Sequence, residues 1–116
     1  MKFKYRNFTI EVKDFDAECG SIRDALSTYM WEECSQDYEE YMALRRADFE
    51  AEDQLQREEY NSSYNIPFGM ECAREGYVRS IEQECSWIVD RWRQRFYNIY
   101  EEKSPRRRRN AAAGRL

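Results

Sequence analysis

The stretch that decides the fold is MECAREGYVRSIEQECSWIVDRWRQRFYNIYEEK, residues 70–103. Its apolar residues recur at steps of three and four, which is the spacing of one face of an α-helix. The members of this stripe are Tyr77, Ile81, Cys85, Ile88, Trp92, Phe96 and Ile99. The pattern predicts one amphipathic helix over 70–103. It ends before Pro105, because proline disfavours the helical conformation of the residue that precedes it.

A second helical region lies upstream of a loop. Residues 61–69, NSSYNIPFG, are rich in turn formers and predict that loop. Residues 21–60 contain neither Pro nor Gly, and good helix formers dominate them. The apolar stripe changes face near Cys34-Ser35-Gln36, which predicts helices near 21–34 and 36–59, the first capped by Ser21. One long helix is the alternative. Because the loop is short, the helices on its two sides are expected to be antiparallel.

The first residues read as β structure. Phe3 and Tyr5 stand at odd positions, whereas Phe8, Ile10 and Val12 stand at even positions, so the parity of the apolar residues changes between them. A flat strand cannot change parity, because successive side chains alternate between its two faces. A tight turn at Arg6-Asn7 explains the change by making residues 2–13 a hairpin, and a bulge is the alternative.

These elements predict an α+β fold that is mainly α. It has an N-terminal β-hairpin followed by an antiparallel helical hairpin or bundle of two to three helices. One globular domain is expected over 1–103, with a flexible basic tail over 104–116. High charge and low hydropathy are typical of disorder, but nine Tyr, six Phe and three Trp supply the material for a core.

Composition excludes several classes of function. The chain has no histidine, so Ser-His-Asp catalysis, Cys-His catalysis and His-ligated zinc or haem cannot occur. No apolar run is long enough to span a bilayer, and no secretory signal follows the first Met. The expectation is a cytoplasmic protein without a cofactor or metal.

Four cysteines stand at positions 19, 34, 72 and 85, without any C-x-x-C pair. A zinc site is therefore not expected. In an antiparallel helical hairpin, Cys72 is expected to face residues near 58 and Cys85 residues near 45, so neither faces Cys34. Reduced, partly buried thiols are predicted, and two disulfides are the alternative.

Carboxylates suggest an enzymatic alternative. Glu32, Glu33 and Asp37 faintly resemble the Glu-Glu…Glu pattern of MazG-like nucleotide pyrophosphohydrolases, which implies a metal-dependent all-helical hydrolase. Glu84 and Asp90 lie on the last helix, but the Glu-x-x-Asp partner of that family is missing there. A solvated acidic face is the favoured interpretation of these residues.

The net charge of -4 conceals a strong segregation along the chain. Residues 14–60 carry fifteen acids and four arginines, whereas residues 104–116 carry five arginines and no acid. On a helix, acids three or four residues apart lie roughly 5–6 Å from each other, which is close to the spacing of phosphates along a nucleic-acid strand. The acidic surface could therefore occupy a basic channel built for DNA or RNA.

The predicted partner-binding residues combine this acidic stretch with aromatic side chains placed off the buried stripes. They are Glu32, Glu33, Asp37, Glu39, Glu40, Asp48, Glu50, Glu52, Asp53, Trp31, Trp87 and Tyr97. The leading hypothesis is a non-catalytic inhibitor that mimics nucleic acid and blocks a basic site on a protein partner. Packing within the fold or in a homodimer is the alternative use of the aromatics.

The basic tail supports a different hypothesis, a protein that binds nucleic acid through Arg106, Arg107, Arg108 and Arg109. In size and charge, the chain is similar to phage-encoded inhibitors of bacterial defence, such as anti-CRISPR and anti-restriction proteins. That similarity implies a viral protein acting in the host cytoplasm.

Overall fold

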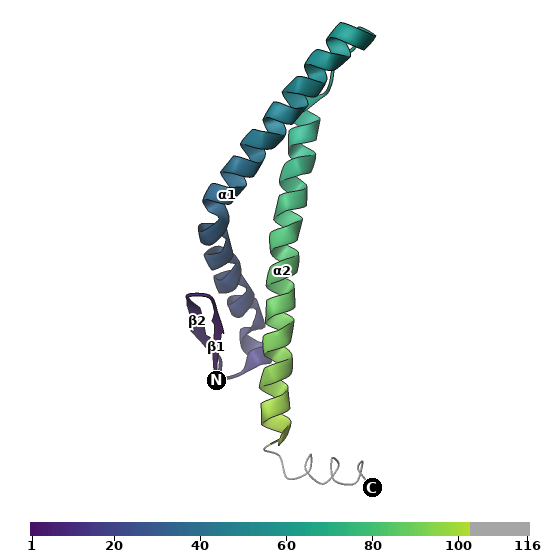
Figure 1. The fold of residues 1–116 in the computed structure, drawn as a ribbon. Coiled ribbons are helices and arrows are strands. Elements are labelled where there is room, and N and C mark those ends of the chain that lie inside the picture. Colours follow the sequence, from purple (N-terminus) through teal and green to yellow (C-terminus); the bar gives the residue numbers. More distant parts are fainter. Residues whose placement is uncertain (103–116) are drawn as a thin grey trace. The chain divides into compact units, whose positions relative to one another are not determined.

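The computed structural model describes residues 1–102, and the side chains of residues 1–98. Two short strands, β1 (Lys2–Tyr5) and β2 (Phe8–Glu11), precede two long helices, α1 (Phe15–Tyr60) and α2 (Ile66–Glu102) (Figure 1). The predicted α+β class, mainly α with a helical hairpin, is confirmed. The predicted tail over 104–116 lies outside the described residues.

The β-hairpin is the one predicted from the change of parity. β1 and β2 pair antiparallel, with Phe3 opposite Ile10 and Tyr5 opposite Phe8. These pairs share a face because directly opposed residues point to the same side of a sheet. Arg6, not Asn7, adopts the positive φ of the turn, at 54°.

The start of α1 differs from the prediction. The helix begins at Phe15 rather than Ser21, and Asp14 caps it by accepting a hydrogen bond from the Ala17 amide at 3.3 Å. Glu18 reaches back and accepts hydrogen bonds from the Lys13 and Asp14 amides at 2.8 and 2.7 Å. These amide donors hold the pKa of Glu18 below its ordinary value. Together, the two acids satisfy amide groups that a helix start leaves without partners, which is the usual work of a capping box.

The break predicted near Cys34–Gln36 is also wrong, because α1 is one helix of 46 residues. The open alternative of a single long helix is the correct one. Side-chain pairs four residues apart support the polar part of the helix, and each such pair contributes about 0.2–0.5 kcal/mol. The hydrogen-bonded pairs are Gln36–Glu40, Glu52–Gln56, Asp53–Arg57 and Gln54–Glu58.

The described residues form two compact units. One contains Met1–Leu26 and the part of α2 from Glu84 onward, and the other contains Ser27–Gln83. The first unit, which we call the hairpin unit, holds nearly all of the buried apolar side chains. They are Phe3, Val12, Phe15, Ile22, Leu26, Cys85, Ile88, Val89 and Trp92.

Aromatic stacking ties the β-hairpin to the helices of this unit. The Phe3 ring stacks on Trp92 with centroids 5.4 Å apart and meets Phe15 edge-on at 6.0 Å. Phe8 stacks on the same Trp92 ring at 6.4 Å. A two-stranded hairpin is marginal alone, so these contacts account for its stability.

In the second unit, which we call the distal unit, the loop between the helices runs back along α1. The Ser62 amide donates to the Gln56 carbonyl at 3.1 Å, and the Tyr64 amide donates to Asp53 Oδ1 at 2.9 Å. Tyr64 then stacks on Phe49 with centroids 5.3 Å apart. Each later loop residue therefore meets an earlier residue of α1.

The loop is shorter than predicted, because α2 begins at Ile66 instead of near residue 70. Asn65 caps this helix by accepting a hydrogen bond from the Phe68 amide at 3.1 Å. Pro67 fits because the first turn of a helix leaves its amide groups unused.

Replacement of Leu26 by alanine tests the core of the hairpin unit. Leu26 is fully buried, so Leu26→Ala should lower the free energy of unfolding in urea by about 2–5 kcal/mol. The matched control is Leu44→Ala on the same helix, where 67% of the side chain is exposed and the change should stay within about 0.5 kcal/mol. Equal losses from both variants would contradict this assignment of the core.

Gly69 offers a second test, because a Cβ there would meet the Tyr64 ring at 3.1 Å and the Phe49 ring at 3.1 Å. Gly76 lies on the same helix with open space around it. Gly76→Ala should raise the free energy of unfolding by about 0.5–1 kcal/mol, because alanine favours helix. Gly69→Ala should not raise the free energy of unfolding in this way, because its Cβ would crowd the Tyr64 and Phe49 rings. If Gly69→Ala stabilises the protein as much as Gly76→Ala does, the loop and α2 are not packed as described.

Candidate functional site

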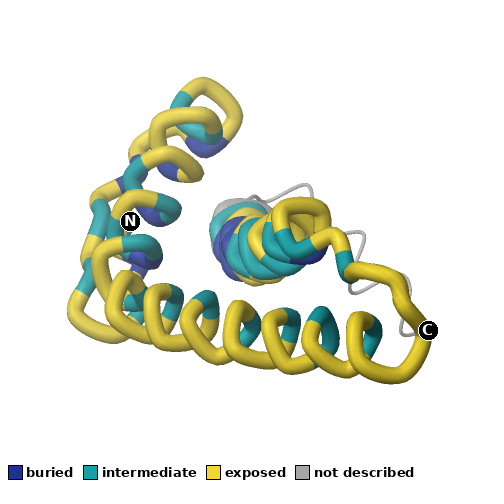
Figure 2. Tube along the Cα trace, turned by 90° about the horizontal axis from the view of Figure 1, so that it is seen from above, coloured by how far each residue is buried: buried dark blue, intermediate teal, exposed yellow. Residues whose placement is uncertain are grey.

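The predicted acidic surface lies on one uninterrupted helix. Seven of the nine predicted acids are exposed on α1, and only Glu52 and Asp53 are half-buried. No residue from 31 to 60 is fully buried, so this length of α1 carries only exposed and half-buried positions (Figure 2). The exposed members are Glu32, Glu33, Asp37, Glu39, Glu40, Asp48 and Glu50.

The charge of the distal unit is strongly negative. Ser27–Gln83 contains fourteen acids and five arginines, a net charge of -9. Three of these arginines pair with acids on their own helix, in the pairs Arg45–Asp48, Arg57–Asp53 and Arg74–Glu71. Exposed pairs of this kind contribute little to stability, but they fix arginines beside particular acids. The other exposed acids of α1 keep their charge available to a partner.

Asp53, one of the predicted partner-binding acids, holds the loop instead. Its two carboxylate oxygens accept hydrogen bonds from the Tyr64 amide at 2.9 Å and from Arg57 Nε at 2.9 Å. The amide bond first, and then Arg57, hold the pKa of Asp53 below its ordinary value. The structure therefore gives this acid a task within the fold.

Trp31 also packs within the distal unit. Its ring meets Tyr38 at 5.7 Å and Tyr77 at 6.0 Å between centroids, and Tyr77 contacts Tyr38 and Tyr41 at 5.1 and 5.3 Å. Burial, followed by a hydrogen bond with Cys34, raises the pKa of Tyr77 to about 12. Trp31 thus belongs to an aromatic cluster that joins α1 to α2.

Trp87 and Tyr97, the other predicted aromatics, lie on α2 in the hairpin unit. Trp87 has 57% of its surface exposed, which fits the prediction that it lies off the buried stripe. Tyr97 is half-buried, and a hydrogen bond with Asp16 raises its pKa. The Arg93 guanidinium lies 5.7 Å from the Tyr97 ring centroid and forms an ion pair with Asp16 at 3.2 Å.

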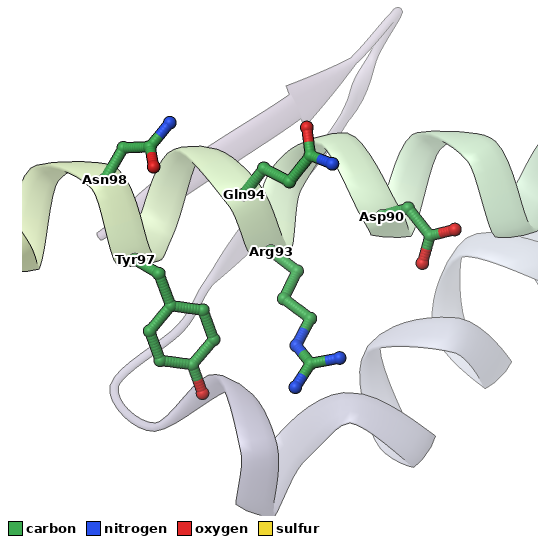
Figure 3. Close-up of a pocket in the computed structure, with 5 residues that line it drawn as sticks. All are labelled: Asp90, Arg93, Gln94, Tyr97 and Asn98. Carbon is green, nitrogen blue, oxygen red and sulfur yellow. The ribbon is translucent and has the colours of Figure 1, made fainter.

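A shallow hollow of about 440 Å³ lies beside Tyr97. It is lined by Asp90, Arg93, Gln94, Tyr97 and Asn98. Figure 3 shows Asp90, Arg93 and Tyr97 pointing to one side of α2, and Gln94 and Asn98 pointing to the other. Because Arg93 and Tyr97 both bond to Asp16, two of the polar groups that line the hollow are already paired.

The four cysteines are free thiols. Cys85 is buried and donates to the Arg23 carbonyl at 3.7 Å, so it lies opposite residue 23 and not near residue 45 as predicted. Burial raises the pKa of the Cys85 thiol. The predicted pairing assumed a tight turn after Tyr60, whereas the loop runs back along α1 and brings Gly69 beside Phe49, which accounts for part of the shift.

Sequence reasoning missed a set of exposed positions on α1. Tyr41, Leu44 and Leu55 are exposed apolar residues, and Asp48 and Ala51 are exposed between them. Their spacing of three, four, three and four residues is that of a coiled-coil seam. This heptad spacing is visible in the sequence, but the larger aromatic residues of the neighbouring stripe obscure it.

Other predicted sites are not assembled here. Among the described side chains of residues 1–98, no three His, Cys, Asp or Glu lie close enough to share a metal ion. The arginines at 106–109, proposed for nucleic-acid binding, lie outside the described residues. None of the described helices is both long and apolar enough to cross a membrane.

Comparison with protein-family models, with curated proteins and with solved structures finds no match to this chain. The function must therefore be argued from the surface itself.

The role of Asp53 can be tested through pH. Because its folded pKa is lowered, the ionised carboxylate stabilises the fold above its unfolded pKa, and this stabilisation is lost as the pH falls through the folded pKa. Asp53→Asn should therefore lower the Tm at pH 7, and the gap from the unaltered protein should narrow as the pH falls below about 4, the unfolded pKa, and through the lower folded pKa.

The matched control for this experiment is Glu50→Gln, which removes an exposed acid of the same helix. Its Tm should follow that of the unaltered protein across the same pH range. A gap for Asp53→Asn that stays constant down to pH 2.5 would contradict the assigned role of its charge.

Proposed function

We propose that this chain is a non-catalytic binding protein. Its acidic α1 surface, residues 32–59, binds a basic nucleic-acid-binding site on a protein partner and keeps nucleic acid out of that site. The observation that carries the proposal is the row of seven exposed acids on a helix without one fully buried residue between 31 and 60. A partner can approach these acids without unfolding anything.

The spacing of the acids favours mimicry of a nucleic-acid strand. Glu33, Asp37 and Glu40 follow each other at four and three residues, so their carboxylates lie roughly 5–6 Å apart along the helix. A basic channel that neutralises successive phosphates can neutralise such carboxylates in the same way. Binding would release counterions, as it does when a protein binds DNA.

The net charge of the distal unit argues against phosphate as its ligand. A surface with a net charge of -9 repels a nucleic-acid backbone and attracts a basic protein, and attraction of this kind also speeds association. In this proposal, the natural partner is a DNA- or RNA-binding complex of bacterial defence. The protein is then a phage-encoded inhibitor that acts in the host cytoplasm.

The proposal predicts that binding depends on where the acids lie, and not on the net charge alone. The variant Glu40→Lys/Glu50→Lys reverses two exposed acids of α1, and Glu75→Lys/Glu82→Lys reverses two exposed acids of α2 with the same change in net charge. The measured quantity is the concentration that releases a fluorescent DNA duplex from protamine, a basic DNA-binding protein. The α1 variant should need at least about tenfold more protein than the α2 variant, because each lost charge pair weakens binding.

The unaltered protein should also lose about tenfold or more in this activity between 50 and 200 mM salt, because counterion release drives the contact. Equal effects of the two double variants, or release of the duplex that does not depend on salt, would contradict the proposal.

A further inference from the structure

One face of α1 has the pattern of a helix that pairs with another helix. Tyr41, Leu44, Asp48, Ala51 and Leu55 follow at three, four, three and four residues, which are the a and d positions of two successive heptads and the a position of a third. We call these five positions the α1 seam. All five are exposed, with exposed fractions of 36% for Tyr41, 67% for Leu44 and 41% for Leu55.

The two leucines are the main apolar groups that the seam offers. They lie eleven residues apart, which is about 16 Å along the helix axis and three full turns. Within the distal unit, α2 packs on the neighbouring side of α1, where Trp31, Tyr38 and Phe49 meet Tyr77 and Tyr64. Tyr41 lies at the border, because its ring also meets Tyr77 with centroids 5.3 Å apart. From Leu44 to Leu55, the exposed seam residues are therefore open to a partner while the helical hairpin stays intact.

Charge decides what kind of helix fits. Glu40 and Glu59 take g and e positions on the two flanks of the seam, and Asp48 lies within it. Asp48 accepts a hydrogen bond from Arg45 at 3.4 Å, and Arg45 in turn lies over the Phe49 ring at 5.1 Å. The Arg45–Asp48 pair is exposed and contributes little, so a partner's cation can replace Arg45 at low cost. A carboxylate in a seam position then selects a partner with a cation opposite it, as buried polar groups do in coiled coils.

A second copy of this chain is a poor occupant. A parallel pair of seams would set Asp48 against Asp48, and a pair in either direction would bring together two units with a net charge of -9. Like charges brought into contact cost free energy. Nucleic acid is excluded by the same charge and has no apolar ridge to meet Leu44 and Leu55.

We propose that the α1 seam docks an amphipathic helix of the partner protein, with apolar residues at heptad spacing and Lys or Arg on both flanks and opposite Asp48. This inference rests on the proposed function and specifies the partner's surface. The acids attract any basic site, whereas the two leucines make apolar contacts only with a site that presents an amphipathic helix. The seam thus provides the selectivity that charge alone lacks, because an apolar contact is not available from a phosphate backbone.

The test uses two synthetic peptides of 21 residues with the same composition. The patterned peptide carries Leu at the a and d positions and Lys at the e and g positions of three heptads, and the scrambled peptide breaks the apolar stripe but keeps the charge. Binding to the full chain is measured by fluorescence anisotropy at 150 mM salt. The patterned peptide should bind at least about tenfold more tightly than the scrambled one, because its apolar stripe adds contacts with two leucines to the charge attraction that both peptides share.

The variant Leu44→Ala/Leu55→Ala should remove this preference and leave binding of the scrambled peptide unchanged. Both side chains are exposed, so the Tm should hold. The matched control is Phe68→Ala on α2, whose exposed fraction of 66% is close to the 67% of Leu44 and whose position lies off the seam. It should keep the full preference.

Three results would overturn the inference. They are equal binding of the two peptides, a preference that survives the double leucine variant, and a dimer of the unaltered protein in sedimentation velocity that the double variant dissociates. If both peptides bind equally and Glu40→Lys/Glu50→Lys weakens both, the seam is not used but the acidic surface still binds basic protein. If that charge variant weakens neither peptide, the proposed function fails as well.

Discussion

The carboxylate of Asp53 is the constraint on which the distal unit depends. By accepting the Tyr64 amide, it turns the chain back along α1 directly after Tyr60. Tyr64 then stacks on Phe49, and Gly69 of α2 follows so closely that its missing Cβ leaves room for both rings. The point at which α2 first meets α1 is therefore near residue 49, and the last turns of α1 are accompanied only by the loop.

The place where α2 first meets α1 determines which side chains of α1 stay exposed. The side of α1 that meets α2 carries Trp31 and Tyr38, which pack against Tyr77 of α2, and the remaining surface carries the exposed acids and the seam from Leu44 to Leu55. A polar helix without buried residues would be marginal alone, and here side-chain pairs four residues apart and the aromatic cluster support it. The same helix can thus belong to a stable hairpin and present seven exposed carboxylates between residues 32 and 50 to a partner.

The sequence predicted what depends on local periodicity. The change of parity between Phe3 and Phe8 located the β-hairpin, and the stripe through Cys85, Ile88 and Trp92 located α2 and its buried face. The start of α1 was missed because Ser21 looked like a cap, whereas Asp14 and Glu18 do that work together. The place where α2 first meets α1 was missed because a loop of five residues can turn tightly or run back, and only a tertiary contact through Asp53 decides which. The acids of 32–50 were predicted to be exposed and are, while a single domain over 1–103 and a binding role for these acids stay predictions.

The most direct measurement of the central claim is an amide chemical-shift map of the unaltered protein during titration with a basic protein partner or the patterned peptide. The account predicts that the largest shifts lie on α1 between residues 37 and 59 and that they disappear at high salt, because the contact is charged and exposed. Shifts centred on the hollow at Asp90–Asn98, or on the β-hairpin, would contradict it and move the binding surface to the hairpin unit.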